Sequence, residues 1–184
     1  MPTALIVVDA QQGFHDPYWG RRDNPAGEEH IAALITAWRR HGEPIVFVRH
    51  DSVHPDSPLH PSSPGNAFLE VVHGEPDLLV VKSVNSCFYG EPDLDAWLRA
   101  RGVDRVAICG FTTNHCCETT ARMAGNLGYE VQFVLDATVT YDRRDLDGAI
   151  IPAETIRRVS AASLQDEFAD VVDTATLVGA RGAR

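Results

Sequence analysis

Val106-Ala107-Ile108-Cys109-Gly110-Phe111-Thr112-Thr113-Asn114-His115-Cys116-Cys117-Glu118 begins as a continuous apolar run, breaks at a glycine and enters a helical pattern through small and hydroxyl residues. This pattern predicts a buried strand followed directly by a helix, with Cys116 near the helix N-terminus. Free backbone N–H groups and the helix dipole favour an anion there and lower the pKa of a thiol. The residues alone leave two interpretations open, a reactive thiolate and a small buried hydrophobe, which is what free cysteines usually are.

The rest of the chain alternates between strand and helix patterns in the same way. Apolar runs predict strands at residues 4–8, 44–48, 77–81, 105–109, 130–135 and 169–172, and helical spacing predicts helices at 25–40, 94–101, up to 126, and from Pro152 to Leu164. Strands separated by helices indicate a parallel sheet with right-handed crossovers. The sequence therefore predicts an α/β, three-layer Rossmann-like fold with helices on both faces, in a single domain spanning residues 1–184.

Three chemically distinct side chains fall at the ends of predicted strands. Asp9 ends the first strand, Lys82 the third, and Cys116 follows the fourth. In open parallel sheets, ligands bind outside the carboxyl ends of the strands. We therefore expect a carboxylate, an ammonium and a thiol to open onto one crevice, although a lysine at a strand end is more often a surface residue.

Composition narrows the classes of partner. The net charge of −10 argues against nucleic-acid binding, and no apolar run reaches the roughly 20 residues that cross a bilayer. The N-terminal residues have no secretory pattern, so a reducing cytoplasm is expected and neither a disulfide framework nor a zinc site is favoured for Cys87, Cys109, Cys116 and Cys117.

A long segment from His50 to Asn66 is rich in Pro, Ser, His and Asp and predicts an irregular loop. Such loops often form a lid or a pocket wall. His50, Asp51, His54 and His60 are potential ligands of a divalent ion. Their loose spacing favours a solvated loop over a metal site.

Three ordered blocks carry a family resemblance: Val8 to Phe14 (VDAQQGF), Lys82 to Gly90 (KSVNSCFYG) and Gly110 to Ala124 (GFTTNHCCETTARMA). Together they make the whole chain resemble the isochorismatase-like cysteine hydrolase superfamily, which includes nicotinamidases, carbamoylsarcosine and biuret amidases, and isochorismatases. The resemblance implies a six-stranded parallel sheet, a homo-oligomer (dimer or tetramer) and a catalytic triad of Asp9, Lys82 and Cys116.

The resemblance also implies details of the nucleophile turn. The pattern Gly-x-x-Thr-x-x-Cys assigns the nucleophile to Cys116 and leaves Cys117 as packing. A cis peptide between Phe111 and Thr112 is implied, which would aim the Thr112 N–H and the Cys116 N–H at one point. Two such donors form an oxyanion hole for a tetrahedral intermediate.

The expected chemistry is hydrolysis of a C–N bond in a small carboxamide or ureido compound. Asp9 would take the proton of Cys116, and Lys82 would favour the thiolate. An isolated aspartate is a poor base for a thiol, so this mechanism requires burial to raise the pKa of Asp9 and Lys82 to lower that of Cys116.

Other residues near the three blocks are weaker candidates. Gln11, Phe14, Phe88, Tyr89 and Phe111 are candidate pocket residues, although aromatic side chains usually belong to the core. His115 should face away from the thiol, because adjacent helical residues point about 100° apart. Nicotinamidases bind a metal through an Asp-x-His pair; here Asp51 and His54 are one residue out of step, so no metal or other cofactor is expected.

Rival functions remain open. An isochorismatase would cleave a vinyl ether without a thiol nucleophile, and the presence of Cys116 favours the amidase. A binding protein on the same fold has little reason to hold an acid and a base beside a thiol. A redox-sensing thiol is a further alternative.

Overall fold

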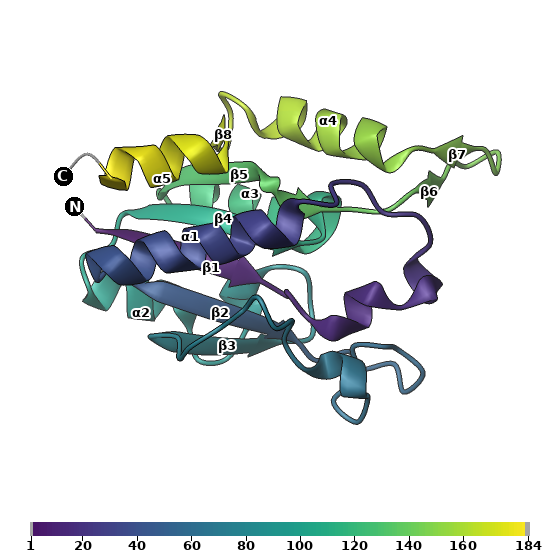
Figure 1. The fold of residues 1–184 in the computed structure, drawn as a ribbon, viewed down its shortest axis with the longest axis horizontal. Helices are drawn as coiled ribbons and strands as arrows, with labels where there is room; N and C mark the ends of the chain where they lie inside the picture. The colour runs from purple at the N-terminus through teal and green to yellow at the C-terminus, as the bar shows by residue number, and fades with distance from the viewer. Residues whose placement is uncertain (1, 183–184) are drawn as a thin grey trace.

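The computed structural model describes residues 2–182 and contains one six-stranded sheet in which every neighbouring pair of strands is parallel. The strand order is β3-β2-β1-β4-β5-β8 (Figure 1). The strands span Thr3–Val8 (β1), Ile45–His50 (β2), Leu78–Lys82 (β3), Arg105–Phe111 (β4), Glu130–Val139 (β5) and Asp170–Val172 (β8). The predicted α/β fold with a six-stranded parallel sheet is confirmed.

Helices cover both faces of this sheet (Figure 1). One face packs against α1 (Gly27–His41) and α5 (Thr174–Gly182), and the other against α2 (Leu94–Ala100), α3 (Glu118–Asn126) and α4 (Ala153–Leu164). The central strand β1 is buried along its whole length, and its alternate side chains enter the two cores. Burial on both faces explains why its sequence is a continuous apolar run rather than an alternating one.

Short helical turns lie mainly in the connections at the carboxyl ends of the strands. They are the 3-10 turns η1 (Gln12–His15), η2 (Pro17–Trp19), η3 (Pro64–Asn66) and η4 (Cys87–Tyr89), and the π-helical turn η5 (Thr113–Cys117). η5 runs directly into α3, so Cys116 lies in the first turns of one continuous helical segment, as the sequence predicts.

Three features differ from the sequence prediction. Helix α5 was not predicted because its helical pattern is weak. Leu177 is the only one of its apolar side chains that is buried. A small hairpin, β6 (Arg143–Arg144) with β7 (Ile150–Ile151), projects from the sheet beyond β5 (Figure 1). Strand β5 does not end at Asp136 but continues through a register shift, which carries it to Val139.

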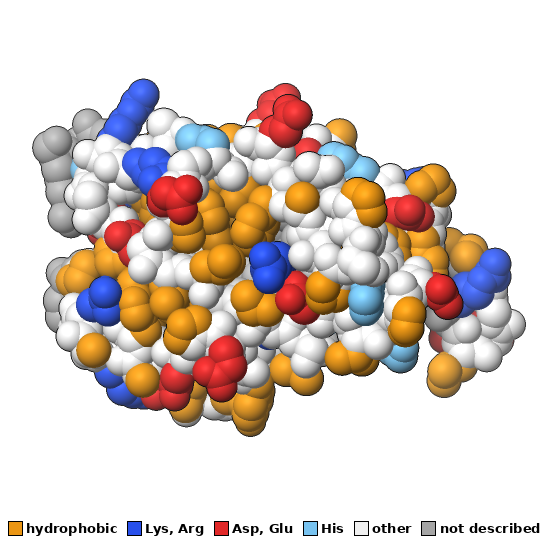
Figure 2. All heavy atoms as spheres, turned by 90° about the horizontal axis from the view of Figure 1, so that it is seen from below, with side chains coloured by type: hydrophobic (Ala, Val, Ile, Leu, Met, Phe, Trp, Pro, Cys, Tyr) orange, Lys and Arg blue, Asp and Glu red, His pale blue; other side chains and the backbone are white. Residues whose placement is uncertain are grey.

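The surface beside β3 contains apolar as well as charged side chains. Figure 2 views the molecule from this side and shows apolar side chains gathered over the middle of the face, with charged ones scattered among them. Leu79, Val84 and Tyr89 are among the exposed large apolar residues of this region. No helix within residues 2–182 is long and apolar enough to cross a membrane.

Gly110 is the position where two central strands approach most closely. Its φ is +122°, and a Cβ atom there would overlap the carbonyl oxygen of Val8, its partner in the β1–β4 register. Both strands are buried, so neither can move aside without disturbing the core. The glycine that interrupts the apolar run is therefore required by backbone packing.

We predict that Gly110→Ala lowers the free energy of unfolding by about 3 kcal/mol, the upper end of overpacking costs. Gly128→Ala is the matched control, because Gly128 also has positive φ but nothing lies within 4 Å of its Cβ position. Urea unfolding of both variants measures the difference. Equal losses of unfolding free energy in the two variants would show that glycine is required at position 110 by its positive φ alone, and not by the contact with Val8.

Candidate active site

Four neighbouring strands each deliver a polar group to the carboxyl edge of the sheet. Asp9 follows β1, His50 ends β2, Lys82 ends β3, and Cys116 lies in η5 after β4. His50 and Lys82 are register partners, so the lysine reaches Asp9 across the end of β2. The strand order reverses between β1 and β4, which makes this edge the expected ligand-binding crevice.

The ammonium of Lys82 is the centre of this cluster. Its Nζ donates to Asp9 Oδ2 at 2.6 Å, to His50 Nδ1 at 3.2 Å and to Cys116 Sγ at 3.4 Å. All three protons of the ammonium are thereby engaged. Lys82 is also the only lysine in the sequence; the other basic residues are arginines. A compact ammonium can serve three acceptors around one point, which the planar guanidinium of arginine cannot.

Asp9 combines an ion pair with an unused oxygen. The side chains of Asp9 and Lys82 are both fully buried. Oδ1 of Asp9 is buried and has no hydrogen-bond partner within the described chain, and the residue has a φ of 47°. A buried acceptor without a partner costs free energy, so it is a candidate for accepting a proton during a reaction.

Burial sets the protonation state of the thiol. It raises the pKa of Cys116, the Asp9 carboxylate raises that pKa further, and the Lys82 ammonium opposes them. The net direction is well above the ordinary value, so the thiol is neutral in the free protein at neutral pH. Lys82 does lower the pKa of Cys116, as expected from the sequence, but desolvation of the charged form and the Asp9 charge outweigh this effect.

Lys82 itself stays charged. Burial alone lowers the pKa of its ammonium, but the Asp9 carboxylate overcomes this effect and leaves the pKa above its ordinary value. The resting site therefore holds a neutral thiol beside a buried ion pair.

The nucleophile turn exposes backbone donors. The peptide bond between Phe111 and Thr112 is cis. The carbonyl oxygen of Thr112 accepts from the N–H groups of His115 and Cys117. It does not accept from the N–H of Cys116, which lies between them in the chain. The N–H of Thr112 has no hydrogen-bond partner among residues 2–182. This arrangement is suited to the oxyanion hole implied by the family resemblance.

Strand β5 holds the same turn from its other side. Thr113 Oγ1 donates to Thr138 Oγ1 at 2.9 Å, and Thr140 Oγ1 donates to Asn114 Oδ1 at 2.6 Å. Thr138 lies in the extension of β5 beyond the predicted end, and Thr140 directly follows the strand. A π-helical turn is often found at functional sites, and here two side-chain hydrogen bonds fix it.

A cavity of about 140 Å³ opens beside the thiol. Its lining residues are Asp9, Phe14, Trp19, His50, Leu59, Asn85, Thr112, His115 and Cys116. Ligand pockets for drug-sized molecules occupy roughly 300–1,000 Å³. The cavity is therefore suited to a molecule of only a few non-hydrogen atoms.

The pocket predictions from sequence are only partly right. Phe14 lines the cavity and stacks on Phe111, whose own side chain lies in the core. Gln11 is fully buried and bonds to backbone atoms, Phe88 packs against Tyr129, and Tyr89 is 71% exposed. Gln11, Phe88 and Tyr89 thus do not line this cavity.

Sequence reasoning missed several cavity residues. His50 was considered from the sequence only as a potential metal ligand. It follows the same rule as Asp9 and Lys82, a polar residue at the carboxyl end of a buried strand, and this signal could have placed it in the cavity. Trp19 and Leu59 come from irregular segments whose position only the tertiary structure sets. His115 is exposed and lines the same cavity as Cys116, and its Nδ1 lies 3.4 Å from Arg143 Nη2.

The cluster does not fit a metal ion. Asp9, His50 and Cys116 each have a ligand atom within 4.8 Å of the others. The Lys82 ammonium, however, donates to all three residues and already supplies a positive charge at this point. Of the loop residues considered from sequence, His50 accepts from Lys82 and Asp51 pairs with Arg49. No group of three potential ligands within residues 2–182 contains Asp51, His54 or His60.

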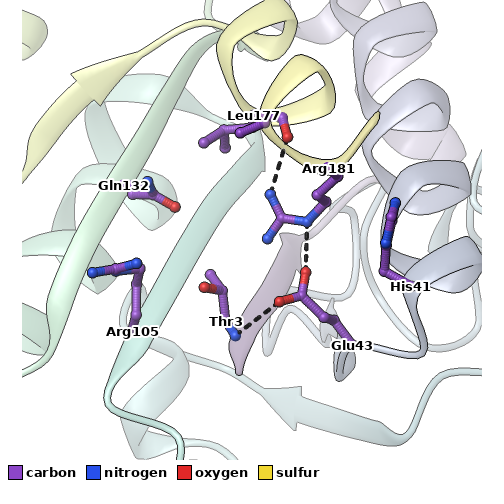
Figure 3. A pocket seen from close by; sticks show the side chains of 8 residues that line it. Thr3, His41, Glu43, Arg105, Gln132, Leu177 and Arg181 are labelled. Atoms are coloured by element: carbon purple, nitrogen blue, oxygen red, sulfur yellow. Dashed lines mark hydrogen bonds and ion pairs between the residues drawn. The ribbon is translucent and has the colours of Figure 1, made fainter. Parts of the chain in front are cut away.

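A larger cavity, of about 230 Å³, lies at the opposite edge of the sheet (Figure 3). Thr3, Arg105 and Gln132 come from the starts of β1, β4 and β5, and Arg181 of α5 bonds to Glu43 at 2.5 Å. Arg105 is paired with Glu130. Both arginines that line this cavity are paired with glutamates, and none of the cysteines lines it.

This arrangement of fold and edge residues is that of a Rossmann-like hydrolase. The chain belongs to the isochorismatase family, because the Isochorismatase domain model matches residues 3–176. The isochorismatase family protein YrdC of Bacillus subtilis (strain 168) is 39% identical over 95% of this chain and 94% of its own length.

Further similarities agree with this assignment. A crystal structure of an isochorismatase family protein from Chromobacterium violaceum has a TM-score of 0.94 and 37% identity, covering 100% of this chain and 95% of the other. Nicotinamidase 3 of Arabidopsis thaliana is 29% identical over 76% of this chain and 74% of its own. The chain is thus a hydrolase of a family that includes amidases.

We predict that Lys82→Met lowers the free energy of unfolding at neutral pH by about 3–5 kcal/mol, because it leaves the Asp9 carboxylate buried without a counter-charge. The double variant Asp9→Asn/Lys82→Met should recover most of this loss, because it removes both charges. Urea unfolding of the two single variants and the double variant measures the coupling. Additive losses would contradict a paired, buried ion pair.

We also predict opposite effects of Asp9 and Lys82 on the thiol. Asp9→Asn should lower the pKa of Cys116 and speed its alkylation by iodoacetamide at about pH 8, because removal of the carboxylate charge raises the thiolate fraction. Lys82→Met should slow it. Cys116→Ala is the control that shows which cysteine is alkylated. It should not react, because the other cysteines, Cys87, Cys109 and Cys117, are fully buried. Slower alkylation of Asp9→Asn would refute the charge balance described above.

Proposed function

We propose that the chain is a cysteine-dependent amidohydrolase that cleaves a C–N bond of a small carboxamide or ureido compound through a thioester. The observation that carries this proposal is the Lys82 ammonium, which contacts both the Asp9 carboxylate and the Cys116 thiol at the end of one cavity. A nucleophile beside a group that can take its proton is the signature of covalent catalysis. Relatives named as amidases, such as Nicotinamidase 3, support the same reaction class.

In the first half of the reaction, Cys116 Sγ attacks the carbonyl carbon and its proton passes to Asp9 Oδ1. The unpartnered state of this oxygen supports the role. The N–H groups of Thr112 and Cys116 stabilise the oxyanion, a contribution worth roughly 3–4 kcal/mol for one such donor in a comparable enzyme. When the C–N bond breaks, Asp9 returns the proton to the leaving nitrogen, and a thioester remains.

In the second half, Asp9 takes a proton from a water molecule that attacks the thioester carbon. The C–S bond breaks, the acid product forms, and the proton on Asp9 returns to the sulfur. The carboxylate and the thiol thus end as they began. Lys82 remains charged throughout. Its charge lowers the free-energy cost of a negative charge on Asp9 or Cys116, a cost that is large in a buried site.

The high pKa of the thiol fits this sequence. A neutral thiol does not hold a buried negative charge before substrate arrives, and the proton moves only as the new bond forms. It also disfavours the redox-sensing alternative, because sensor cysteines have a low pKa and are accessible to solvent. Cys116 is 8% exposed.

A small-molecule substrate, a homo-oligomeric state and a cytoplasmic location are part of the proposal. The volume of the cavity supports the first. The family resemblance and the exposed apolar side chains beside β3 support the second, since surfaces of this kind often mediate protein contacts.

We predict that Cys116→Ala lowers ammonia release from the active members of a panel of small amides and ureido compounds by about 10³-fold or more. Cys117→Ala is the matched control, because Cys117 is adjacent, fully buried and assigned no chemical role. Isochorismate consumption is measured in parallel. Isochorismate loss that is equal in wild type and Cys116→Ala, without ammonia release, would replace this proposal with the vinyl-ether hydrolase.

A further inference from the structure

His50 is held in place through its backbone. Gln11 Oε1 accepts from the His50 N–H at 2.8 Å, and Gln11 Nε2 donates to the His50 carbonyl oxygen at 3.1 Å. Asn66 Nδ2 donates to the same carbonyl at 3.2 Å and to Leu59 O at 2.9 Å. These bonds fix the end of β2 and the long loop together, and none of them depends on the imidazole.

The imidazole has one defined tautomer. Its Nδ1 lies 3.2 Å from Lys82 Nζ, and an ammonium can only donate, so Nδ1 is the acceptor and the proton is on Nε2. Burial and the Lys82 charge both lower the pKa of His50, while Asp9 and Asp51 oppose them, and the net direction is downward. The ring is therefore neutral at neutral pH.

The Nε2–H donor is directed to no protein acceptor. Nδ1 makes the only ring hydrogen bond of His50 among residues 2–182. His50 lines the cavity, and one of its ring nitrogens lies within 4.8 Å of both Cys116 Sγ and an Asp9 oxygen. A carbon under attack lies about 3–3.5 Å from the sulfur, so atoms next to it are within reach of the ring.

We propose that His50 is a specificity-determining residue, whose Nε2–H donates a hydrogen bond to a second acceptor oxygen of the substrate, next to the scissile carbonyl. This inference rests on the proposed thiol amidase. The oxygen of the scissile carbonyl is already assigned to the N–H groups of Thr112 and Cys116, so His50 requires another one. The substrate class is then an N-acylurea or a similar compound with two nearby carbonyl groups, rather than a simple monoamide.

A substrate without this oxygen would leave the Nε2–H group without a partner. Bound substrate excludes water from this nitrogen, and a donor left without a partner there costs about 1–3 kcal/mol, which corresponds to a preference of roughly 10- to 100-fold. N-acetylurea and N-ethylurea form a matched pair of probes, because a methylene group replaces one carbonyl group and the rest of the molecule is the same.

The test measures how well each urea protects Cys116 from iodoacetamide, together with kcat and KM where ammonia is released. Wild type should favour N-acetylurea by at least tenfold. His50→Leu should abolish most of this preference, and His50→Gln, which keeps an acceptor and a donor, should restore part of it. Loss of the contact to Lys82 affects both probes equally and cancels in the ratio.

An unchanged ratio in His50→Leu, or no preference in wild type, would overturn the proposal. The outcome is separate from that of the amidase itself. Ammonia release that depends on Cys116 but shows no preference controlled by His50 would leave the proposed function standing and remove this inference. Protection with the expected preference but without turnover of either urea would support the hydrogen bond from His50 and contradict these ureas as substrates of the proposed amidase.

Discussion

The structure depends on one buried cation. Lys82 Nζ contacts a carboxylate, an imidazole and a thiol that come from β1, β2 and the turn after β4. A buried charge is stable only when polar partners surround it. The side chains at the carboxyl ends of four strands must therefore lie within hydrogen-bond distance of Lys82 Nζ. The sheet order β3-β2-β1-β4 meets this requirement directly.

The same burial sets the chemistry of the nucleophile. The start of a helical segment and a nearby ammonium both favour a thiolate, yet desolvation and the Asp9 charge raise the pKa of Cys116. The larger effect is desolvation, because the thiol is almost excluded from water. Proton transfer to Asp9 during attack, rather than a preformed thiolate, is the mechanism that this balance favours.

Two hydrogen-bonded supports keep the cluster rigid. On one side, Gln11 and Asn66 bind the backbone of His50 and attach the long loop to the end of β2. On the other side, Thr138 and Thr140 of the β5 region bind the turn that carries Cys116. Both supports consist of buried or partly buried polar groups with satisfied partners, which fix geometry well in a low-dielectric interior.

The sequence by itself determined the fold and the three residues at the carboxyl edge. Apolar runs that alternate with helical patterns specify a parallel sheet, and position at a strand end brought out Asp9, Lys82 and Cys116. Only the tertiary structure decided the cavity wall: Leu59 arrives on a loop, and Phe88 turns into the core although it follows Lys82 closely in the chain. It also decided the net pKa of the thiol. Periodicity records which face of an element is buried, whereas loop placement and desolvation depend on contacts between segments distant in sequence.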